Sequence, residues 1–270
     1  MSLLFSAMAL ACCVQSASGV PTLPDGARTR WVVDQPEETV CYLAFDPVTV
    51  ERRLPSTLRF ITIGELAEGG VRWAADHLAG HPSRGRWGIS FLEIVRMGTF
   101  TIDGRAPNWP ENGAAALWCA RVAPSDTTAD LGPGLPLLAL EFWVPDSAYV
   151  AYMRGKGHYA TYGDVRLHRD SEGKWRGSID VDSLSVVAEC APVGPISGGA
   201  GSAGMQIFIP PRSSNATGVV RLAFAGHREQ QCEGDSSWTI HGTHPLAGAV
   251  VLGPAVFQFG YDLVGGAYPK

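Results

Sequence analysis

The sequence predicts a mainly β protein of the α+β class, an antiparallel and barrel-like structure with a few short helices. Three observations support this prediction. Short apolar runs of strand length recur along the chain, and 32 Gly and 19 Pro residues separate them. Apolar residues make up 46% and charged residues 17% of the 270 residues, which is typical of a globular protein with a substantial core. Two segments only carry a helix start signal.

The expected strands are runs rich in branched aliphatic and aromatic residues. In chain order they span 40–45, 58–66, 87–102, 114–122, 137–144, 161–168, 175–181, 184–190, 205–209, 219–225, 238–241 and 255–263. One helix is expected to begin at Asp46, with Pro47 at its first position, and a second at Asp146. The Pro- and Gly-rich stretches 103–112, 123–136 and 191–204 are expected to be loops, two of which flank the candidate site region and could rim a pocket.

The charge balance excludes two classes of partner. The formal net charge is -5, and no run of basic residues occurs. Nucleic acids and anionic membrane surfaces both attract clustered Lys and Arg, so neither is expected to bind.

The first 19 residues, MSLLFSAMALACCVQSASG, predict a secretory signal peptide. The stretch from Leu3 to Val14 is apolar, and small residues follow it. It is too short to span a bilayer, which needs about 20 residues. A buried N-terminal strand or helix is the alternative, because no Lys or Arg precedes the apolar stretch. Residues 20–270 are expected to form a single domain that is secreted or resides in the secretory-pathway lumen.

Cleavage of that segment would leave four cysteines, Cys41, Cys119, Cys190 and Cys232. Four cysteines allow three pairings, among which the sequence does not choose. Two disulfides in an oxidising compartment and four buried free thiols both remain open. Asn215 begins an Asn-Ala-Thr glycosylation signal, which is relevant only to a secreted chain.

Four segments in order resemble the acetoacetate decarboxylase-like superfamily. They are CYLAFDPVTVERRLPSTL (41–58), GISFLEIV (88–95), GKGHYATYGDVRLHRD (155–170) and HPLAGAVVLGPAVFQFGYDL (244–263). The resemblance covers most of residues 40–264. It implies the superfamily's barrel-like fold, a decarboxylase-like activity on β-keto acids, and association into homo-oligomers.

The resemblance also implies a changed active site. The superfamily forms a Schiff base through a lysine, and the matching position is Ala160. It often has an arginine in its opening strand, where this chain has Ala44. Glu93 is retained at the position of the superfamily's acidic site residue. The fold is therefore expected without the imine chemistry.

Glu93 is a candidate catalytic residue independently of the resemblance. Alternate residues of a strand share a face, so Glu93 is expected to lie on one apolar face with Trp87, Ile89, Phe91, Val95 and Met97. A carboxyl group in such a setting must be paired or neutral with a raised pKa, and either state suits acid–base catalysis. The alternatives are a Glu bonded to Arg or backbone, or a register that exposes it.

Three further residues have chemistry that suits the same site. His158 and Tyr159 adjoin the position of the absent lysine and could transfer a proton or bond an enolate oxygen. Glu141 alternates with Leu137, Ala139 and Trp143, so it could share a cavity with Glu93 and split the two pKa values. A surface His, a core Tyr and a structural Glu are the competing interpretations. The expected substrate-binding residues are Glu141, Ala160, Thr161 and Phe91.

Neither a metal nor a cofactor is expected. His77 and His81 have helical zinc spacing, but Gly80 and Pro82 interrupt the helix and the Glu is missing. The pair His241 and His244 lacks a third ligand and fits a turn better. The G-x-G-x-x-G pattern at 199–204 precedes a strand rather than a helix, so it does not predict a dinucleotide site.

We expect an enzyme that binds a carbonyl-bearing, largely apolar small molecule, such as a polyketide or another secondary metabolite. Glu93, with His158 or Tyr159, would move protons in an enolisation, dehydration, cyclisation or decarboxylation without an imine. One alternative is a non-catalytic secreted protein that binds a small molecule. The other is a Schiff-base β-keto acid decarboxylase that uses Lys156, although in an extended chain this residue lies roughly 13 Å from position 160.

Overall fold

The computed structural model describes residues 26–128, 131, 134–198, 202–209, 218–234 and 237–269. The expected signal segment at 1–19 and the glycosylation signal at Asn215 lie outside these residues.

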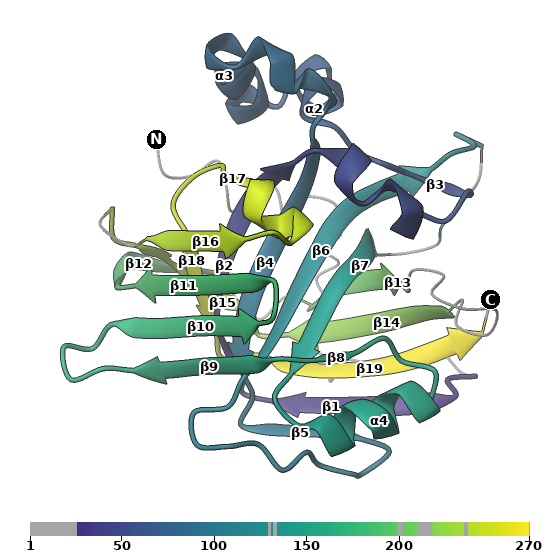
Figure 1. The fold of residues 1–270 in the computed structure, drawn as a ribbon, viewed down its shortest axis with the longest axis vertical. Helices are drawn as coiled ribbons and strands as arrows, with labels where there is room; N and C mark the ends of the chain where they lie inside the picture. The colour runs from purple at the N-terminus through teal and green to yellow at the C-terminus, as the bar shows by residue number, and fades with distance from the viewer. Residues whose placement is uncertain are drawn as a thin grey trace.

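A large, strongly bent sheet dominates the described part of the chain (Figure 1). Its main path runs β12-β15-β18-β2-β4-β6-β7-β13-β14-β19-β1-β5, while β17 pairs with β2, β3 with β6, and β8 with β7. Its fifteen strands are β1 (Thr29–Asp34), β2 (Glu37–Phe45), β3 (Leu58–Phe60), β4 (Gly88–Arg96), β5 (Thr99–Ile102), β6 (Ala115–Pro124), β7 (Leu135–Val144), β8 (Thr161–Tyr162), β12 (Pro192–Gly198), β13 (Ser202–Phe208), β14 (Gly218–Ala225), β15 (Arg228–Cys232), β17 (Val250–Val251), β18 (Val256–Phe259) and β19 (Asp262–Pro269).

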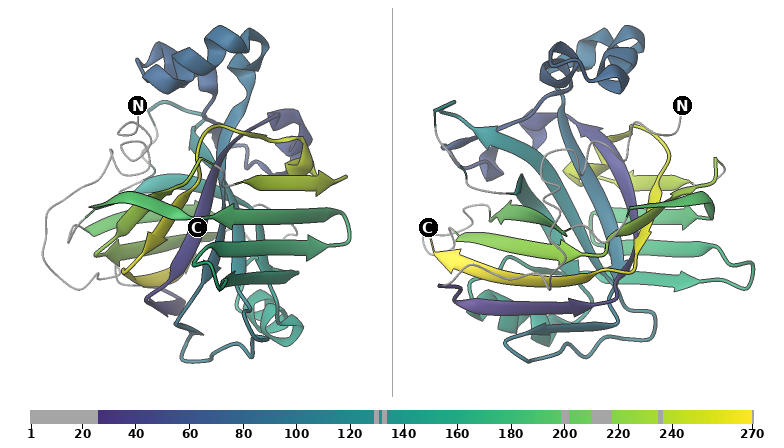
Figure 2. Two further views of the ribbon diagram at one scale, coloured as in Figure 1. Left: turned by 90° about the vertical axis from the view of Figure 1, so that its left-hand side faces the viewer. Right: turned by 180° about the vertical axis from the view of Figure 1, so that it is seen from behind.

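The mainly β, antiparallel class is confirmed. In the large sheet, β7 pairs in parallel with β13 and with β8, and the other pairs are antiparallel. The end strands β12 and β5 do not pair with each other, so the sheet is barrel-like without being a closed barrel. The views in Figure 2 show how the sheet curls, with β13, β14, β19 and β1 turned across the face of β2, β4 and β6.

A second, four-stranded antiparallel sheet packs against the outer face of the large one. Its order is β16-β11-β10-β9, with β9 (Asp164–Arg169), β10 (Trp175–Val181), β11 (Leu184–Cys190) and β16 (Trp238–Gly242). The largest core cluster lies between the two sheets and includes Leu92, Ile94 and Trp118 from one and Leu167 and Ile179 from the other. These residues are all fully buried.

The structure shows which of the four cysteines form a disulfide. Cys190 at the end of β11 is bonded to Cys232 at the end of β15, which ties the small sheet to the edge of the large one. Cys41 and Cys119 are buried free thiols on β2 and β6. Of these four cysteines, two therefore form one disulfide and two are thiols, which lies between the two alternatives that the sequence left open.

The predicted helix starts are correct, but two helices were missed. Asp46 caps a short 3-10 helix, Pro47–Thr49, rather than an α-helix, and a second 3-10 helix, Glu51–Arg53, follows it. Asp146 caps α4 (Ser147–Gly155) by accepting a hydrogen bond from the Tyr149 amide. The missed helices α2 (Ile63–Glu68) and α3 (Arg72–Gly80) form a projection at one end of the sheet (Figure 1). Two further 3-10 helices span Pro82–Arg86 and Pro245–Gly248.

Several predicted strands end where a local signal overrides the apolar pattern. The expected strand 58–66 stops at Phe60 because Thr62 and Glu65 form a reciprocal capping box that starts α2. The expected strand 161–168 is divided at Gly163, where a Cβ atom would lie 2.8 Å from the Val181 side chain. The expected loop 191–204 is wrong for most of its length, because β12 and the start of β13 lie within it.

In the described ranges, no helix is both long and apolar enough to cross a membrane.

Candidate active site

An internal cavity with two lobes lies on the inner face of the large sheet. The first lobe has a volume of about 110 Å³ and the second about 80 Å³, so the first alone accommodates a ligand with on the order of ten non-hydrogen atoms. Residues lining only the first lobe include Tyr42, Phe91, Arg121, Met205, Phe224 and His227. Those lining only the second include Trp31, Val33, Met97, Phe142, His158 and Tyr159. Seven residues line both, and they are Glu38, Glu93, Leu117, Ile207, Leu222, Tyr261 and Leu263.

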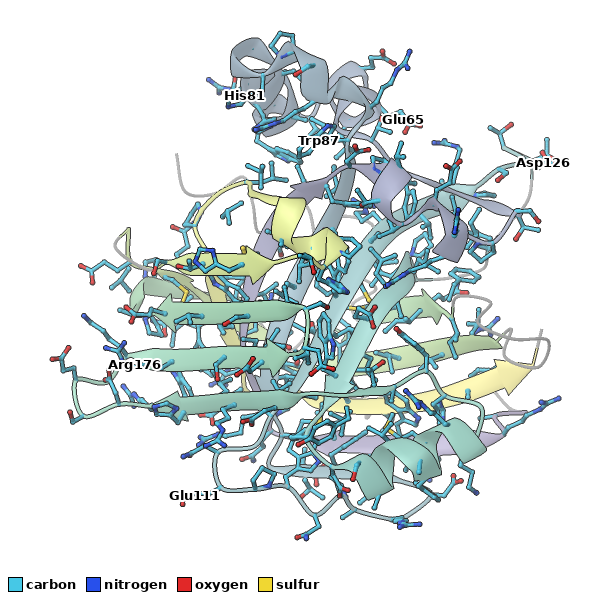
Figure 3. All side chains as sticks on the ribbon, viewed as in Figure 1. Glu65, His81, Trp87, Glu111, Asp126 and Arg176 are labelled. Carbon is cyan, nitrogen blue, oxygen red and sulfur yellow. A yellow bond between two sulfur atoms is a disulfide. The ribbon has the colours of Figure 1, made fainter. Side chains whose placement is uncertain are left out.

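The predicted face of Glu93 is confirmed in β4. Ile89, Phe91 and Glu93 line the first lobe, and Glu93, Val95 and Met97 line the second, whereas Leu92 and Ile94 face the core between the sheets. The alternation of one strand thus brings the carboxyl group to the junction of the lobes. Trp87 is the exception: it precedes β4 and packs beside the α2–α3 projection (Figure 3).

The Glu93 carboxyl group makes no hydrogen bond or ion pair with any described residue. It faces an apolar cavity, and this burial raises the pKa of Glu93 well above its usual value, with a further contribution from the nearby Glu38. The protonated form of Glu93 therefore persists to a higher pH than that of an ordinary Glu. The expectation that Glu93 is a structural carboxylate paired with Arg has no support in this geometry.

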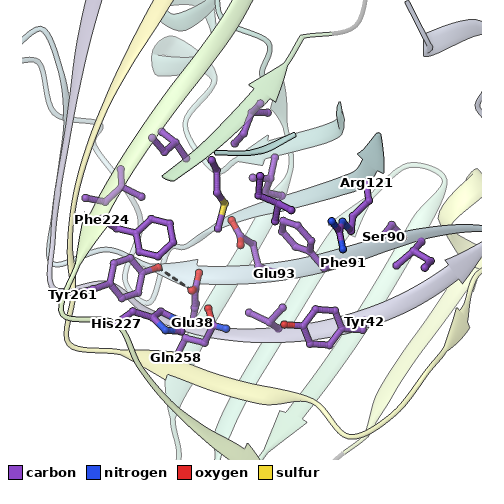
Figure 4. A pocket seen from close by; sticks show the side chains of 18 of the residues that line it. Glu38, Tyr42, Ser90, Phe91, Glu93, Arg121, Phe224, His227, Gln258 and Tyr261 are labelled. Atoms are coloured by element: carbon purple, nitrogen blue, oxygen red, sulfur yellow. Dashed lines mark hydrogen bonds between the residues drawn. The ribbon is translucent and has the colours of Figure 1, made fainter. Parts of the chain in front are cut away.

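Glu38 is a second cavity carboxyl group, and the sequence did not reveal it. It lies on β2, which pairs with β4 so that Val40 is opposite Glu93 and Glu38 is opposite Val95. The Tyr261 hydroxyl donates a hydrogen bond of 2.8 Å to Glu38 Oε1 (Figure 4). Burial raises the pKa of Glu38 to about 7, although the bond from Tyr261 acts in the opposite direction. Glu38, Val40 and Tyr42 are alternate residues and would share one face of a strand. The strand was expected to begin only at residue 40, however, so Glu38 was left out of it.

His158 lines the second lobe with a neutral imidazole ring. Its Nε2 accepts a 3.2 Å hydrogen bond from Trp31 Nε1, which can only donate, and lies 2.9 Å from Thr29 Oγ1. The ring proton of neutral His158 is therefore on Nδ1, which makes no hydrogen bond with a described residue and is buried. Burial lowers the pKa of His158 to about 4, so the ring stays uncharged near neutral pH.

This depressed pKa predicts an acid-sensitive step in stability. In the unfolded chain a His titrates near pH 6.5, whereas folded His158 does so near 4, so stability is lost as the pH falls from 6.5 to 4. The loss should approach about 3 kcal/mol at the lower limit. Urea unfolding of wild type and His158→Asn at several pH values measures it. The difference between the two proteins should change over this pH range, and a constant difference would contradict the assignment.

Comparisons with known proteins bear on the fold. No protein-family model and no curated protein matches the sequence. Solved structures do match, including an acetoacetate decarboxylase-like enzyme from Sphingomonas wittichii RW1, at 12% identity over 91% of this chain and 93% of that chain, with a TM-score of 0.50. Acetoacetate decarboxylase from Legionella pneumophila matches at 12% identity over 94% and 93%, with a TM-score of 0.52. The chain has the acetoacetate decarboxylase-like fold.

A third match is the enduracididine biosynthesis enzyme MppR complexed with pyruvate, at 12% identity over 94% of this chain and 92% of that chain, with a TM-score of 0.51. The resemblance read from four segments is therefore confirmed for the fold. At such low identity the likeness extends to the fold alone, so the chemistry has to be argued from the residues of this chain.

Within the acetoacetate decarboxylase-like fold, position 160 is closed to the cavity. Ala160 is fully buried, and its carbonyl oxygen accepts a 2.8 Å hydrogen bond from Arg154 Nε. Neither Ala160 nor Thr161 is among the residues lining the two lobes, whereas Phe91 lines the first. Ala44 lies on the same face of β2 as Val40 and Tyr42, but it is buried against the helical projection and lines neither lobe.

Lys156 does not replace the absent lysine. Its ammonium group lies on the surface, 3.0 Å from Asp103 Oδ2 and over the ring of Tyr152, and it lines neither lobe. The bond with Asp103 raises the pKa of Lys156, which is opposite to what imine formation requires. The Schiff-base alternative based on Lys156 is contradicted by this position.

Glu141 lies on the other face of its strand from the one we predicted. The pairing of β6 with β7 shifts between Trp118, which is opposite Glu141, and Cys119, which is opposite Ala139, so Leu140 is an extra residue. Such a bulge reverses the alternation. Leu137 and Ala139 face the cavity side, whereas Glu141 and Trp143 face the core, and Glu141 lines neither lobe.

The Glu141 carboxylate instead belongs to a buried polar network, which is linked to the cavity wall through Tyr159. It accepts hydrogen bonds from Arg53 Nη1 and from the Tyr159 hydroxyl, and lies 3.4 Å from His244 Nε2. Tyr159 thus presents its ring to the second lobe while its hydroxyl proton is directed to Glu141. The hydroxyl proton of Tyr159 is consequently directed away from a ligand oxygen in the second lobe.

The candidate metal ligands in the sequence are two pairs of His residues. His77 lies in α3 and His81 at its end, with ring centroids 5.0 Å apart. Across the described residues, no group of three or more His, Cys, Asp or Glu side chains is arranged to hold a metal ion.

Proposed function

We propose that this protein is an enzyme that moves protons on a carbonyl-bearing, largely apolar small molecule held in the two-lobed cavity, without forming an imine. One observation carries the proposal: the Glu93 carboxyl group, which makes no hydrogen bond with a described residue, lies in an apolar cavity whose second lobe is also lined by the neutral ring of His158. A proton donor or acceptor and a separate oxygen-binding group are what enolisation requires.

The geometry favours a substrate whose carbonyl group lies at the junction of the lobes. Apolar and aromatic side chains line both lobes, so an apolar group on each side of the carbonyl would be desolvated favourably. A neutral imidazole N–H polarises a carbonyl oxygen without adding a charge to the cavity. Enolisation is the step shared by isomerisation, cyclisation, dehydration and decarboxylation of such compounds. The pyruvate in the MppR complex is itself a carbonyl compound, which is consistent with this class.

Proton exchange on a simple ketone tests the proposal. Cyclohexanone has apolar carbon on both sides of its carbonyl group and exchanges its α-hydrogens through the enol. We expect the wild-type protein to accelerate deuterium incorporation from deuterium oxide, measured by proton NMR, and to yield no covalent adduct after borohydride reduction and mass spectrometry. Binding with no exchange above buffer would instead favour a non-catalytic binding protein. A borohydride-trapped lysine would contradict the imine-free mechanism.

A further inference from the structure

Two carboxyl groups, not one, face the junction of the lobes. Glu38 and Glu93 are both among the seven residues that line both lobes, and they lie on adjacent strands one diagonal step apart (Figure 4). Diagonal neighbours on an antiparallel pair are within reach of long side chains. The two groups therefore share one apolar volume, in which their charges interact.

Within the described residues, no ammonium or guanidinium group lies against this pair. Arg121 is the single Lys or Arg among the described residues that line the lobes. The register of β4 and β6 places Glu93 opposite Leu117, four residues or roughly 13 Å along the strand from Arg121. Two like charges at close range in an apolar site do not both ionise readily, so the pair retains one proton near neutral pH.

The two carboxyl groups differ in their hydrogen bonds. Tyr261 donates to Glu38 Oε1, whereas Glu93 accepts no hydrogen bond from the described residues. A donor stabilises the ionised form of the group that it contacts. The negative charge is thus favoured on Glu38 and the proton on Glu93, while burial raises the pKa values of both groups.

From this asymmetry we infer that Glu38 is the catalytic base and Glu93 the catalytic acid of one proton-transferring pair. The assignment rests on the proposed function of the same cavity. The Glu38 carboxylate takes the proton of the substrate α-carbon, and the electron pair of that C–H bond forms the carbon–carbon double bond of the enol. The π electron pair of the carbonyl group moves to its oxygen, which takes the proton of Glu93, so that the C=O double bond becomes a C–OH single bond. One proton has moved to Glu38 and one has left Glu93, so charge is conserved, and protonation at carbon reverses both transfers.

The surroundings of the pair leave few other groups that titrate near neutral pH. Burial raises the pKa values of Tyr42, Cys119 and Tyr261, so these remain protonated, and it lowers that of His158. The remaining titratable groups near the pair are His227 and Tyr159, which line the cavity, and Glu229, a buried residue two strands from Glu38.

Carbon-13 NMR of the glutamate carboxyl carbons tests the pair without a substrate. In Glu38→Gln, the midpoint of Glu93 should fall by at least about one pH unit, because the neighbouring charge is removed. In Glu93→Gln, the midpoint of Glu38 should change much less, because Glu93 is still protonated when Glu38 ionises. Tyr261→Phe should raise the midpoint of Glu38, while Tyr42→Phe, a matched loss of a cavity hydroxyl, should not. An unchanged Glu93 midpoint in Glu38→Gln would overturn the pairing.

Cyclohexanone exchange then separates this inference from the proposed function. We expect Glu38→Gln to lower the exchange rate at least a hundredfold, and Tyr261→Phe to shift the pH–rate profile upward with the Glu38 midpoint. If wild type is active and Glu38→Gln retains more than half of its rate, the assignment of Glu38 as base is wrong and the proposed function stands. If wild type shows no exchange, the proposed function itself fails. The Tyr261→Phe titration keeps the test decisive if Glu38→Gln does not fold.

Discussion

Replacing Glu93 with Gln is expected to lower the rate of ketone α-proton exchange by about a hundredfold to ten-thousandfold, the usual contribution of a positioned acid or base. Gln has nearly the same shape but has no proton to transfer at these pH values. The fold should be retained, because Glu93 makes no hydrogen bond or ion pair with a described residue that the change would break, and the side-chain shape is nearly the same. Exchange rates by NMR and the melting temperature together measure the effect.

Glu37→Gln is the matched control for this variant. Glu37 lies on β2 next to Glu38, but it points to the partly exposed surface, where it pairs with Arg96. We expect its exchange rate to stay within twofold of wild type. Retention of more than half the wild-type rate in Glu93→Gln would contradict the role of Glu93, whatever the control shows.

Replacing Glu141 with Gln is expected to have the largest effect on stability, a loss of about 3 kcal/mol or more. The Glu141 side chain is only 6% exposed and accepts from Arg53, whose side chain is 23% exposed. Removing one charge of a buried pair leaves the other without compensation, and it also weakens the anchor of the Tyr159 hydroxyl. Urea denaturation should report a lower midpoint with an unchanged slope.

The double variant Arg53→Met with Glu141→Leu separates charge from packing. With both charges removed, stability should recover toward wild type, because apolar side chains of similar size fill the same volume. Glu37→Gln again serves as the control, since its ion pair is more than one third exposed and should contribute less than about 1 kcal/mol. A loss in Glu141→Gln no larger than in this control would show that the network is not structural.

Local signals in the sequence predicted correctly those features that depend on one helix or one strand alone. The cap at Asp146 predicted the start of α4, and the alternation around Glu93 predicted the residues that line the cavity. Both depend on interactions within a few residues or on the period of one strand. The same reasoning was wrong for Glu141, because the bulge at Leu140 is a property of the pairing between β6 and β7 and not of β7 alone.

The sequence by itself determined the β-rich class and the strand face that carries Glu93. Only the tertiary structure decided which carboxyl group meets Glu93. Glu38 reaches the cavity through the register of β2 with β4, and its partner Tyr261 is 223 residues away. The physical reason is that strand periodicity fixes the direction of a side chain, whereas its neighbours depend on the register and curvature of a sheet built from distant segments.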